Sequence, residues 1–399
     1  MAAAAAATRN RPQVEESPAD AESRHASGTD RSESARILDA CERKDIDELR
    51  DMAIAPGGFL SDPLRSRAWP ILLGFDAGAT SGGSTGTSAS WRDLPPHRDE
   101  EQVRLDVNRS FVYYPNDNSQ TQLKEKKSEL SDLITQVLRE QPYLCYFQGY
   151  HDICQVFLLV LPPPLRALAV SRLSVLRIRD FMLPTLAPAI VQLRLIPDIL
   201  RAVDPELCRH LSRNEPYFAL ADTLTMFAHN VRRYSDIARL FDALLAREQV
   251  FGVYVFAHIV TRRRDELLAH DEPDMLHFAL SKLPPDLDLD AVIADAALLF
   301  GRHPPESLRS WRRVSGASAL KTTRDARVLA RQSLRDGRRF FDRQVGELRR
   351  AERSQKVMQA AWANRTLLLT ILIGVGAIYL RKTATWTSLM AWVARLGWD

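Results

Sequence analysis

Cysteine is scarce in this chain, and its few cysteines form no recognisable pattern. The 399 residues contain four of them, with no C-x-x-C pair; they are Cys41, Cys145, Cys154 and Cys208. Disulfide frameworks and zinc sites need cysteines in repeated, close spacings. We therefore interpret all four as small core residues and expect a reducing compartment and no metal site.

Strand patterns and a nucleotide-binding loop are also missing. No window alternates apolar and polar residues with β-branched enrichment, whereas apolar residues at three- and four-residue spacing recur along most of the chain. Apolar residues make up 45% of the sequence, which is enough for a large core. The sequence therefore predicts an all-α fold, with a buried helix over Val250–Val260 for which a strand is the alternative. We expect the chain to bind no cofactor of its own.

Positive charge exceeds negative charge by only a small amount. The formal net charge is +4, the sequence pI is about 8.9, and acidic residues interleave with the arginines. Nucleic-acid binders concentrate positive charge on one face or segment. We therefore expect no nucleic-acid partner.

Two segments have too few large apolar residues to form a core. Residues 1–34 are alanine, charged and small polar residues, so we predict a disordered N-terminal segment. Residues 76–90 are rich in Gly, Ala, Ser and Thr, which predicts a flexible insertion. We expect no secretory signal, because no continuous apolar run follows the start.

Two short motifs carry the residues with the clearest chemical use. The first is Val103-x-x-Asp106-x-x-Arg109, whose named residues are spaced to share one face of a helix that we expect over Glu100–Phe111. The second is Tyr146-Phe-Gln148-Gly149, predicted to form a turn between an amphipathic helix and a buried one. An arginine can stabilise charge on a transferring phosphoryl group, and a glutamine amide can orient an attacking water.

With the earlier element Arg65-x-x-x-Trp69-x-x-Leu72, these motifs resemble those of the TBC (Tre-Bub-Cdc) domain, the fold of Rab GTPase-activating proteins. The resemblance covers about residues 35–305. In detail it is closest to a membrane-anchored subgroup linked to the endoplasmic reticulum, through Gly57-Gly58, Gln148–Ile153, Arg179–Met182 and Arg239–Asp242. It implies a GTPase activator rather than an enzyme, with a Rab-family small GTPase as partner. GTP and Mg²⁺ would be bound by the Rab and not by this chain. The subgroup resemblance implies that the substrate is the Rab of ER-to-Golgi traffic.

The same resemblance assigns roles to individual residues. Arg109 is the expected arginine finger and Gln148 the expected glutamine finger, while Arg104 falls on another helix face. The expected supporting residues are Asp106, Tyr146, Gly149, Asp152 and Trp69. Asp106 would hold a neighbouring group, Asp152 would orient the glutamine loop, and Trp69 would brace the start of the domain. We expect Arg65 to pair with an acidic group inside the domain.

One alternative reading of this region is a catalytic dyad of His151 and Asp152. Adjacent helical residues rarely face each other, and no nucleophile accompanies the pair, so we do not expect acid–base catalysis.

The C-terminal quarter of the chain suggests attachment to a membrane. Residues 306–357 alternate basic and acidic residues and predict a charged linker helix. Residues 358–382 contain an uncharged run, 366–380, flanked by cations, from which we predict a transmembrane anchor. Residues 383–399 are expected to form a short amphipathic tail, and a membrane hairpin formed with this tail is the alternative to a single span.

The fold class predicted is thus an all-α TBC domain with a C-terminal transmembrane helix, on an endoplasmic reticulum or early Golgi membrane. The functional alternative is a membrane-anchored adaptor that binds a Rab without stimulating hydrolysis.

Overall fold

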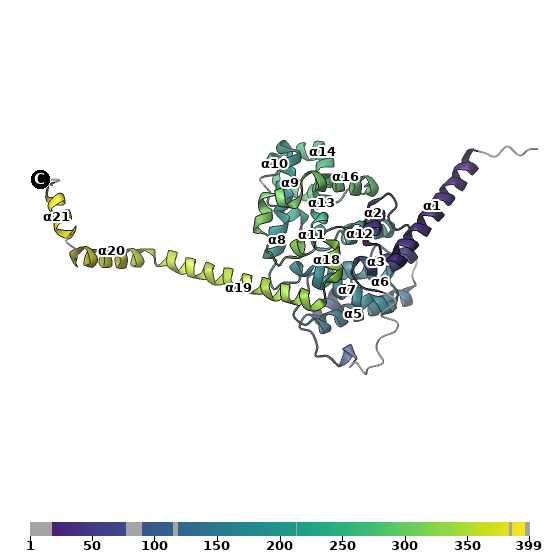
Figure 1. The fold of residues 1–399 in the computed structure, drawn as a ribbon, viewed down its shortest axis with the longest axis horizontal. Coiled ribbons are helices and arrows are strands. Elements are labelled where there is room, and N and C mark those ends of the chain that lie inside the picture. The colour runs from purple at the N-terminus through teal and green to yellow at the C-terminus, as the bar shows by residue number, and fades with distance from the viewer. Residues whose placement is uncertain (1–17, 77–89, 115–118, 213, 383–384, 396–399) are drawn as a thin grey trace, which may run out of the picture. The chain divides into compact units, whose positions relative to one another are not determined.

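Helices make up the whole of the regular structure described. The computed structural model describes residues 18–76, 90–114, 119–212, 214–382 and 385–395. Within these ranges the regular elements are helices, which confirms the predicted all-α fold (Figure 1). The chain consists of two compact units, and the boundary between them lies between Phe341 and Asp342.

The first unit contains most of the helices. The α-helices of its N-terminal half are α1 (Pro18–Arg43), α2 (Ile46–Ile54), α3 (Asp62–Leu72), α4 (Glu100–Val107), α5 (Gln120–Glu140), α6 (Tyr150–Val160), α7 (Pro163–Arg172), α8 (Ala187–Leu193) and α9 (Leu195–Val203). They are followed by α10 (Pro205–Leu211), α11 (Leu220–Leu224), α12 (Tyr234–Ala246), α13 (Phe251–Arg262), α14 (Arg264–Leu268), α15 (Pro273–Leu280), α16 (Leu289–Arg302), α17 (Ala319–Thr322) and α18 (Ala326–Arg331). Helix α19 (Leu334–Ala363) begins in the first unit, and α20 (Arg365–Lys382) and α21 (Thr385–Arg395) lie in the second.

The core is built around helices that are apolar on nearly every side. Helix α13 packs against α9 and α16, and helix α6 packs against α3, α5 and α7. The sequence of α13 left a strand open as an alternative; the structure has a helix with eight buried side chains. Helices of this kind are stable only inside a large core.

Trp69 lies at the centre of this core. Its ring packs edge-on against Phe157 of α6, with the centroids 5.5 Å apart, and its Nε1 donates to Asp242 Oδ1 at 2.8 Å. Arg65, one turn earlier on α3, also donates to Asp242 at 3.1 Å. Burial raises the pKa of the Asp242 carboxyl to about 6, although Arg65 opposes the shift. The expected internal pairing of Arg65 is confirmed.

The compact unit extends beyond the predicted domain end at residue 305. Trp311 and Leu320 are buried, Asp180 accepts from the backbone N–H of Ala319 at 3.0 Å, and Arg179 donates to the carbonyl of Ala317 at 2.7 Å. The predicted linker over 306–357 therefore divides at Phe341, and its first part belongs to the core. The interleaved charges concealed the few apolar anchors that decide this.

The N-terminal segment differs from the prediction as well. Residues 1–17 and 77–89 lie outside the described residues. They are the first half of the predicted disordered segment and nearly all of the predicted insertion. Residues 18–34, which we expected to be disordered, form the first part of α1. This helix continues into the segment of Ile37 and Cys41, which are buried, and packing there can sustain a helix of weak intrinsic preference.

The predicted transmembrane helix is wrong. None of the helices in the described parts of the chain is long and apolar enough to cross a membrane. Helix α20 has 18 residues and includes Arg365, Arg381 and Lys382. The uncharged run of 15 residues falls short of the roughly 20 that a bilayer core requires, and the cations at its ends do not extend it.

Candidate functional site

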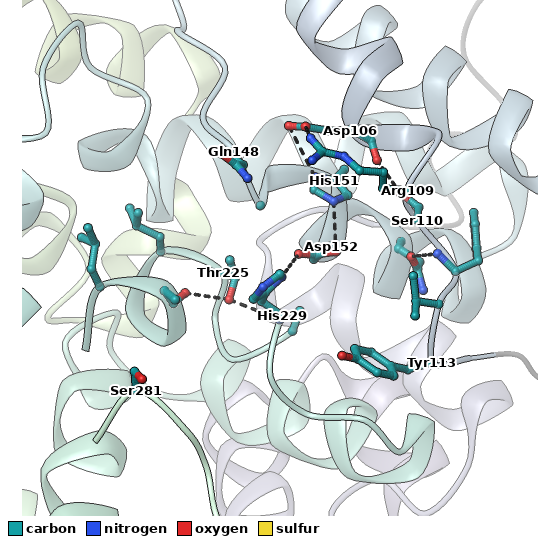
Figure 2. Close-up of a pocket in the computed structure, with 18 of the residues that line it drawn as sticks. Asp106, Arg109, Ser110, Tyr113, Gln148, His151, Asp152, Thr225, His229 and Ser281 are labelled. Atoms are coloured by element: carbon teal, nitrogen blue, oxygen red, sulfur yellow. Dashed lines mark hydrogen bonds and ion pairs between the residues drawn. The ribbon is translucent and has the colours of Figure 1, made fainter. Parts of the chain in front are cut away.

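The two sequence motifs meet at an open cavity of about 590 Å³ in the first unit (Figure 2). One side of it is formed by the segment after α4 and by the start of α6, which bring Arg109 and Gln148 to the same space. The opposite side comes from residues 217–229 and from the end of α15. Residues more than a hundred positions apart in the chain thus face one cavity.

Arg109 lies just beyond the C-terminal end of α4, not within a helix reaching Phe111 as we expected. The helix ends at Val107, and the backbone N–H of Arg109 bonds to the carbonyl of Asp106 at 3.0 Å. This final turn leaves the Arg109 side chain 66% exposed. Arg104 instead pairs with Glu101 at 2.6 Å on the outer face of α4 and does not line the cavity.

Asp106 is the buried partner of this arginine. Its carboxylate is fully buried and accepts from Arg109 at 2.6 Å, Gln102 at 3.0 Å and the Tyr146 hydroxyl at 2.9 Å. A buried carboxylate needs this many donors to offset the loss of hydration. Asp106 therefore ties the arginine to the second motif.

Tyr146 links Asp106 to His151. Its hydroxyl lies 3.2 Å from His151 Nδ1, and burial, aided by the charge of Asp106, raises the pKa of the phenol. Burial lowers the pKa of His151, against the attraction of Asp152 and Asp106. These contacts fix the base of the turn that carries Gln148.

The turn that presents Gln148 depends on Gly149. Phe147 is buried against Tyr150 and Phe181, which leaves Gln148 exposed at the apex. Gly149 has φ +97°, and a Cβ there would lie 2.5 Å from Thr225 Cγ2. Both the backbone conformation and the close approach of Thr225 require glycine.

Asp152 does not act alone at the start of α6. Its Oδ1 lies 3.2 Å from His151 Nε2, and its Oδ2 lies 2.9 Å from His229 Nδ1. Our expectation that His151 and Asp152 do not face each other was wrong, since their side chains turn toward one another at the first helical turn. The expected role of Asp152 in orienting the glutamine loop stays a prediction.

The far wall was not found from the sequence. Thr225 and His229 line the cavity, as do Tyr217, His277 and Ser281, but none belongs to a motif. The sequence showed only helical periodicity here, and these contacts form between segments distant in the chain. Of the predicted site residues, Tyr146 lies behind the cavity lining, where it bonds to Asp106, and Trp69 lies in the core behind α6.

The cavity offers an arginine and an amide to a ligand brought from outside. Within the described residues, no three His, Cys, Asp or Glu side chains are grouped so as to hold a metal ion. Exposed apolar side chains lie at its edge, with Val112 70% exposed and Tyr217 47% exposed. Such a rim fits a macromolecular surface better than a small molecule.

Comparison with known proteins decides the family. The Rab-GTPase-TBC domain model matches residues 62–268, slightly more than half of the chain. This chain belongs to the RabGAP-TBC family. The match includes both motifs and the far wall as far as Leu268, so the cavity lies largely inside the family domain.

Relatives of this RabGAP-TBC protein span most of its length. TBC1 domain family member 20 of Homo sapiens is 32% identical over 360 residues, which cover 85% of this chain and 86% of the relative. The same protein of Bos taurus is 33% identical over 354 residues, 86% of each chain. These matches confirm the resemblance to Rab GTPase-activating proteins that the sequence motifs indicated.

More distant similarities agree. The GTPase-activating protein gyp10 of Schizosaccharomyces pombe is 33% identical over 312 residues, covering 76% of this chain and 81% of its own. The crystal structure of a Chlamydomonas flagellar RabGAP TBC domain aligns with a TM-score of 0.52 and 13% identity, over 71% of this chain and 97% of that domain. At this identity the structural match supports the fold alone.

Proposed function

We propose that this protein is a GTPase-activating protein for a Rab-family small GTPase and supplies Arg109 and Gln148 in trans. The observation that carries the proposal is their convergence: a guanidinium and an amide from separate motifs, both exposed, line one open cavity. Family membership supports the same reading, as does the name of the gyp10 relative.

Arg109 acts in this proposal on the charge of the transferring phosphoryl group. Charge spreads over the equatorial oxygens of that group in the transition state, and a guanidinium donates to two of them at once. The Arg109 guanidinium donates to Asp106 at 2.6 Å, so the long arginine side chain is partly ordered before the partner binds.

Gln148 acts on the attacking water. Its amide can accept from the water and donate to a phosphoryl oxygen, and the buried Phe147 and the left-handed Gly149 on either side limit its movement. GTP and Mg²⁺ are carried by the Rab in this scheme, and the chain requires no cofactor of its own.

The partner and the place of action extend the proposal. The subgroup resemblance in Gly57-Gly58, Gln148–Ile153 and Arg239–Asp242 supports the Rab of ER-to-Golgi traffic as substrate, with action at the endoplasmic reticulum or early Golgi. The exposed rim of Val112, Tyr113 and Tyr217 is the surface that would meet the GTPase.

The test is single-turnover GTP hydrolysis by a panel of purified Rabs with the full chain. We expect stimulation of one or a few Rabs, and Arg109→Ala should remove about 10³- to 10⁵-fold of it. Gln148→Ala should cost a similar amount or less. Arg104→Ala is the matched control, because Arg104 is an exposed arginine on α4, five residues before Arg109 and outside the cavity, and its loss should leave the rate unchanged.

Full stimulation by Arg109→Ala would contradict the assignment. If GTP-loaded Rab binds the chain while no Rab on the panel is stimulated, the chain is a Rab-binding adaptor and the proposal fails.

A further inference from the structure

His229 reaches the cavity from the wall opposite the two motifs. It lies between α11 and α12, its side chain is 58% exposed, and its Nδ1 is 2.9 Å from Asp152 Oδ2 (Figure 2). Among the described side chains of this wall, it makes the hydrogen bond that crosses to α6. No motif contains it.

The backbone that carries His229 is held in an unusual conformation. Met226 and Phe227 have φ of +51° and +67°, and both side chains are buried. Left-handed backbone at such residues is strained and persists only where the surroundings enforce it. The segment 225–230 is therefore a shaped support, and it presents His229 in one place.

Hydrogen bonds to Asp222 of α11 hold this segment in place. The carbonyl of Asp222 accepts from the N–H of Phe227 at 2.8 Å, and Asp222 Oδ1 accepts from Asn230 Nδ2 at 2.9 Å. The N–H of His229 also donates to Thr225 Oγ1 at 3.3 Å. Residues on both sides of His229 are thus fixed to the end of α11.

The same segment contacts the glutamine turn a second time. Thr225 Cγ2 packs on the backbone of Gly149, which directly follows Gln148. The side chain of Asp152 is held by His229, and its backbone N–H donates to the carbonyl of Gly149 at 3.1 Å. Thr225 directly, and His229 through Asp152, therefore both act on Gly149.

A chain of contacts continues from Asp152 to the arginine. Asp152 Oδ1 is 3.2 Å from His151 Nε2, and His151 Nδ1 is 3.2 Å from the Tyr146 hydroxyl. That hydroxyl donates to Asp106, which binds Arg109. His229 stands at one end of this chain and Arg109 at the other.

We propose that His229 is a positioning residue: through Asp152 it holds the first turn of α6, and with it the Gln148 turn, in the geometry needed beside Arg109. Only the expected effect on GTP hydrolysis rests on the proposed function; the expected effect on the Gln148 turn does not. Asp152, Asp222 and His151 are the titratable groups that face His229, and the bond to Asp152 raises the pKa of the imidazole. Nδ1–H donates to Asp152 in both the neutral and the charged form, so the contact persists across neutral pH.

Three substitutions separate this role from others. His229→Ala removes the donor. His229→Asn places an amide N–H near the position of Nδ1, and His229→Gln places it one bond further out. The positioning role predicts that Asn restores function and that Gln does not.

The first measurement is amide hydrogen exchange of the full chain without any GTPase. We expect His229→Ala to accelerate exchange in residues 145–153, and His229→Asn to leave it near the wild-type rate. His277→Ala is the matched control, a histidine that lines the same cavity from α15, and it should leave residues 145–153 unchanged. Unchanged exchange in His229→Ala would overturn the inference, whatever the GTPase results.

The second measurement is single-turnover hydrolysis with the responding Rab over a range of activator concentrations. We expect His229→Ala to lower the maximal rate about tenfold, as small displacements of catalytic groups do, while the half-saturating concentration stays within about twofold. A change confined to the half-saturating concentration would make His229 a docking residue and contradict the inference. If wild-type chain stimulates no Rab while the exchange result holds, the proposed function fails and the positioning role stands.

Discussion

At the scale of single residues, Asp222 is the clearest case of a group held against its chemical preference. It is fully buried, and within the described part of the chain its Oδ2 has no hydrogen-bond partner. Burial raises the pKa of this carboxyl to about 7, although Asn230 and His229 oppose the shift. Near neutral pH the folded protein therefore holds a proton on Asp222 that the unfolded chain has lost.

Asp222 should make stability depend on pH in a defined window. Its folded pKa of about 7 exceeds the ordinary value of 3.8, so the stabilisation is complete below about pH 4 and is lost as the pH rises to about 7. Relative to Asp222→Asn, the wild-type free energy of unfolding should fall by about 1.4 kcal/mol per pH unit and then level off. Urea denaturation of both proteins from pH 5 to pH 8 measures this difference.

Comparison with the Asn variant cancels opposing contributions, such as that of the buried His151, whose pKa burial lowers. A difference that is constant across the range would show that Asp222 is ionised in the folded protein.

At the scale of elements, the turn between α5 and α6 concentrates the constraints of the site. Its glycine is the N-cap of α6, and the first turn of that helix carries His151 and Asp152. Any change in the backbone at Gly149 thus moves Gln148 on one side and the Asp152 contacts on the other.

Gly149→Ala should impair both folding and activity. A Cβ at φ +97° is strained, and it would meet Thr225 Cγ2 at 2.5 Å. We expect a loss of at least about 1 kcal/mol in the free energy of unfolding and a fall in stimulated hydrolysis of about tenfold or more. Gly301→Ala in α16 is the control, because a Cβ there meets nothing within 4 Å and alanine favours the helix. Equal effects of the two substitutions would show that the turn does not constrain the site.

Sequence periodicity predicted the elements better than their ends. The all-α fold and the helices flanking Gln148 follow from apolar spacing, which depends on local chain geometry alone. The end of α4 at Val107 was missed, because the turn at Asn108 is stabilised by Lys127, which donates to the Asn108 carbonyl at 2.6 Å from another helix. Local patterns contain no information about such a partner.

At the scale of the whole molecule, the limits of the compact unit were the hardest to foresee. Arg177 and Arg179 are buried and bond mainly to backbone carbonyls, and those of Arg179 include Ala317 in the segment we assigned to a linker. A charged sequence with few apolar residues gives little sign that it closes a core. The 15-residue uncharged run led to a wrong prediction of a transmembrane helix, because the run has the composition of a membrane span but is too short to be one.

A fragment that ends at Phe341 should therefore fold, whereas one that ends at Pro305 should be strongly destabilised. The shorter fragment exposes the pockets of Trp311 and Leu320 and leaves Arg179 without two of its acceptors, the Ala317 carbonyl and the Thr322 hydroxyl. Loss of partners to a buried cation costs several kcal/mol. Thermal unfolding of both fragments measures the difference, with the full chain as reference. A shorter fragment as stable as the longer one would place the boundary at residue 305 after all.

The exposed apolar edge formed by Tyr217 and α15 is encoded apart from the two motifs and makes none of the contacts that hold the Gln148 turn, so selection can act on it separately. Arg109 and Gln148 lie within forty residues of each other, while Tyr217 and α15 supply an exposed apolar surface that takes no part in the proposed chemistry. Substitutions at that wall can alter which GTPase is recognised while the arginine and glutamine stay unchanged. Under the proposed function, gene duplication followed by drift at Tyr217 and α15 is then a short route from one activator to several with different partners.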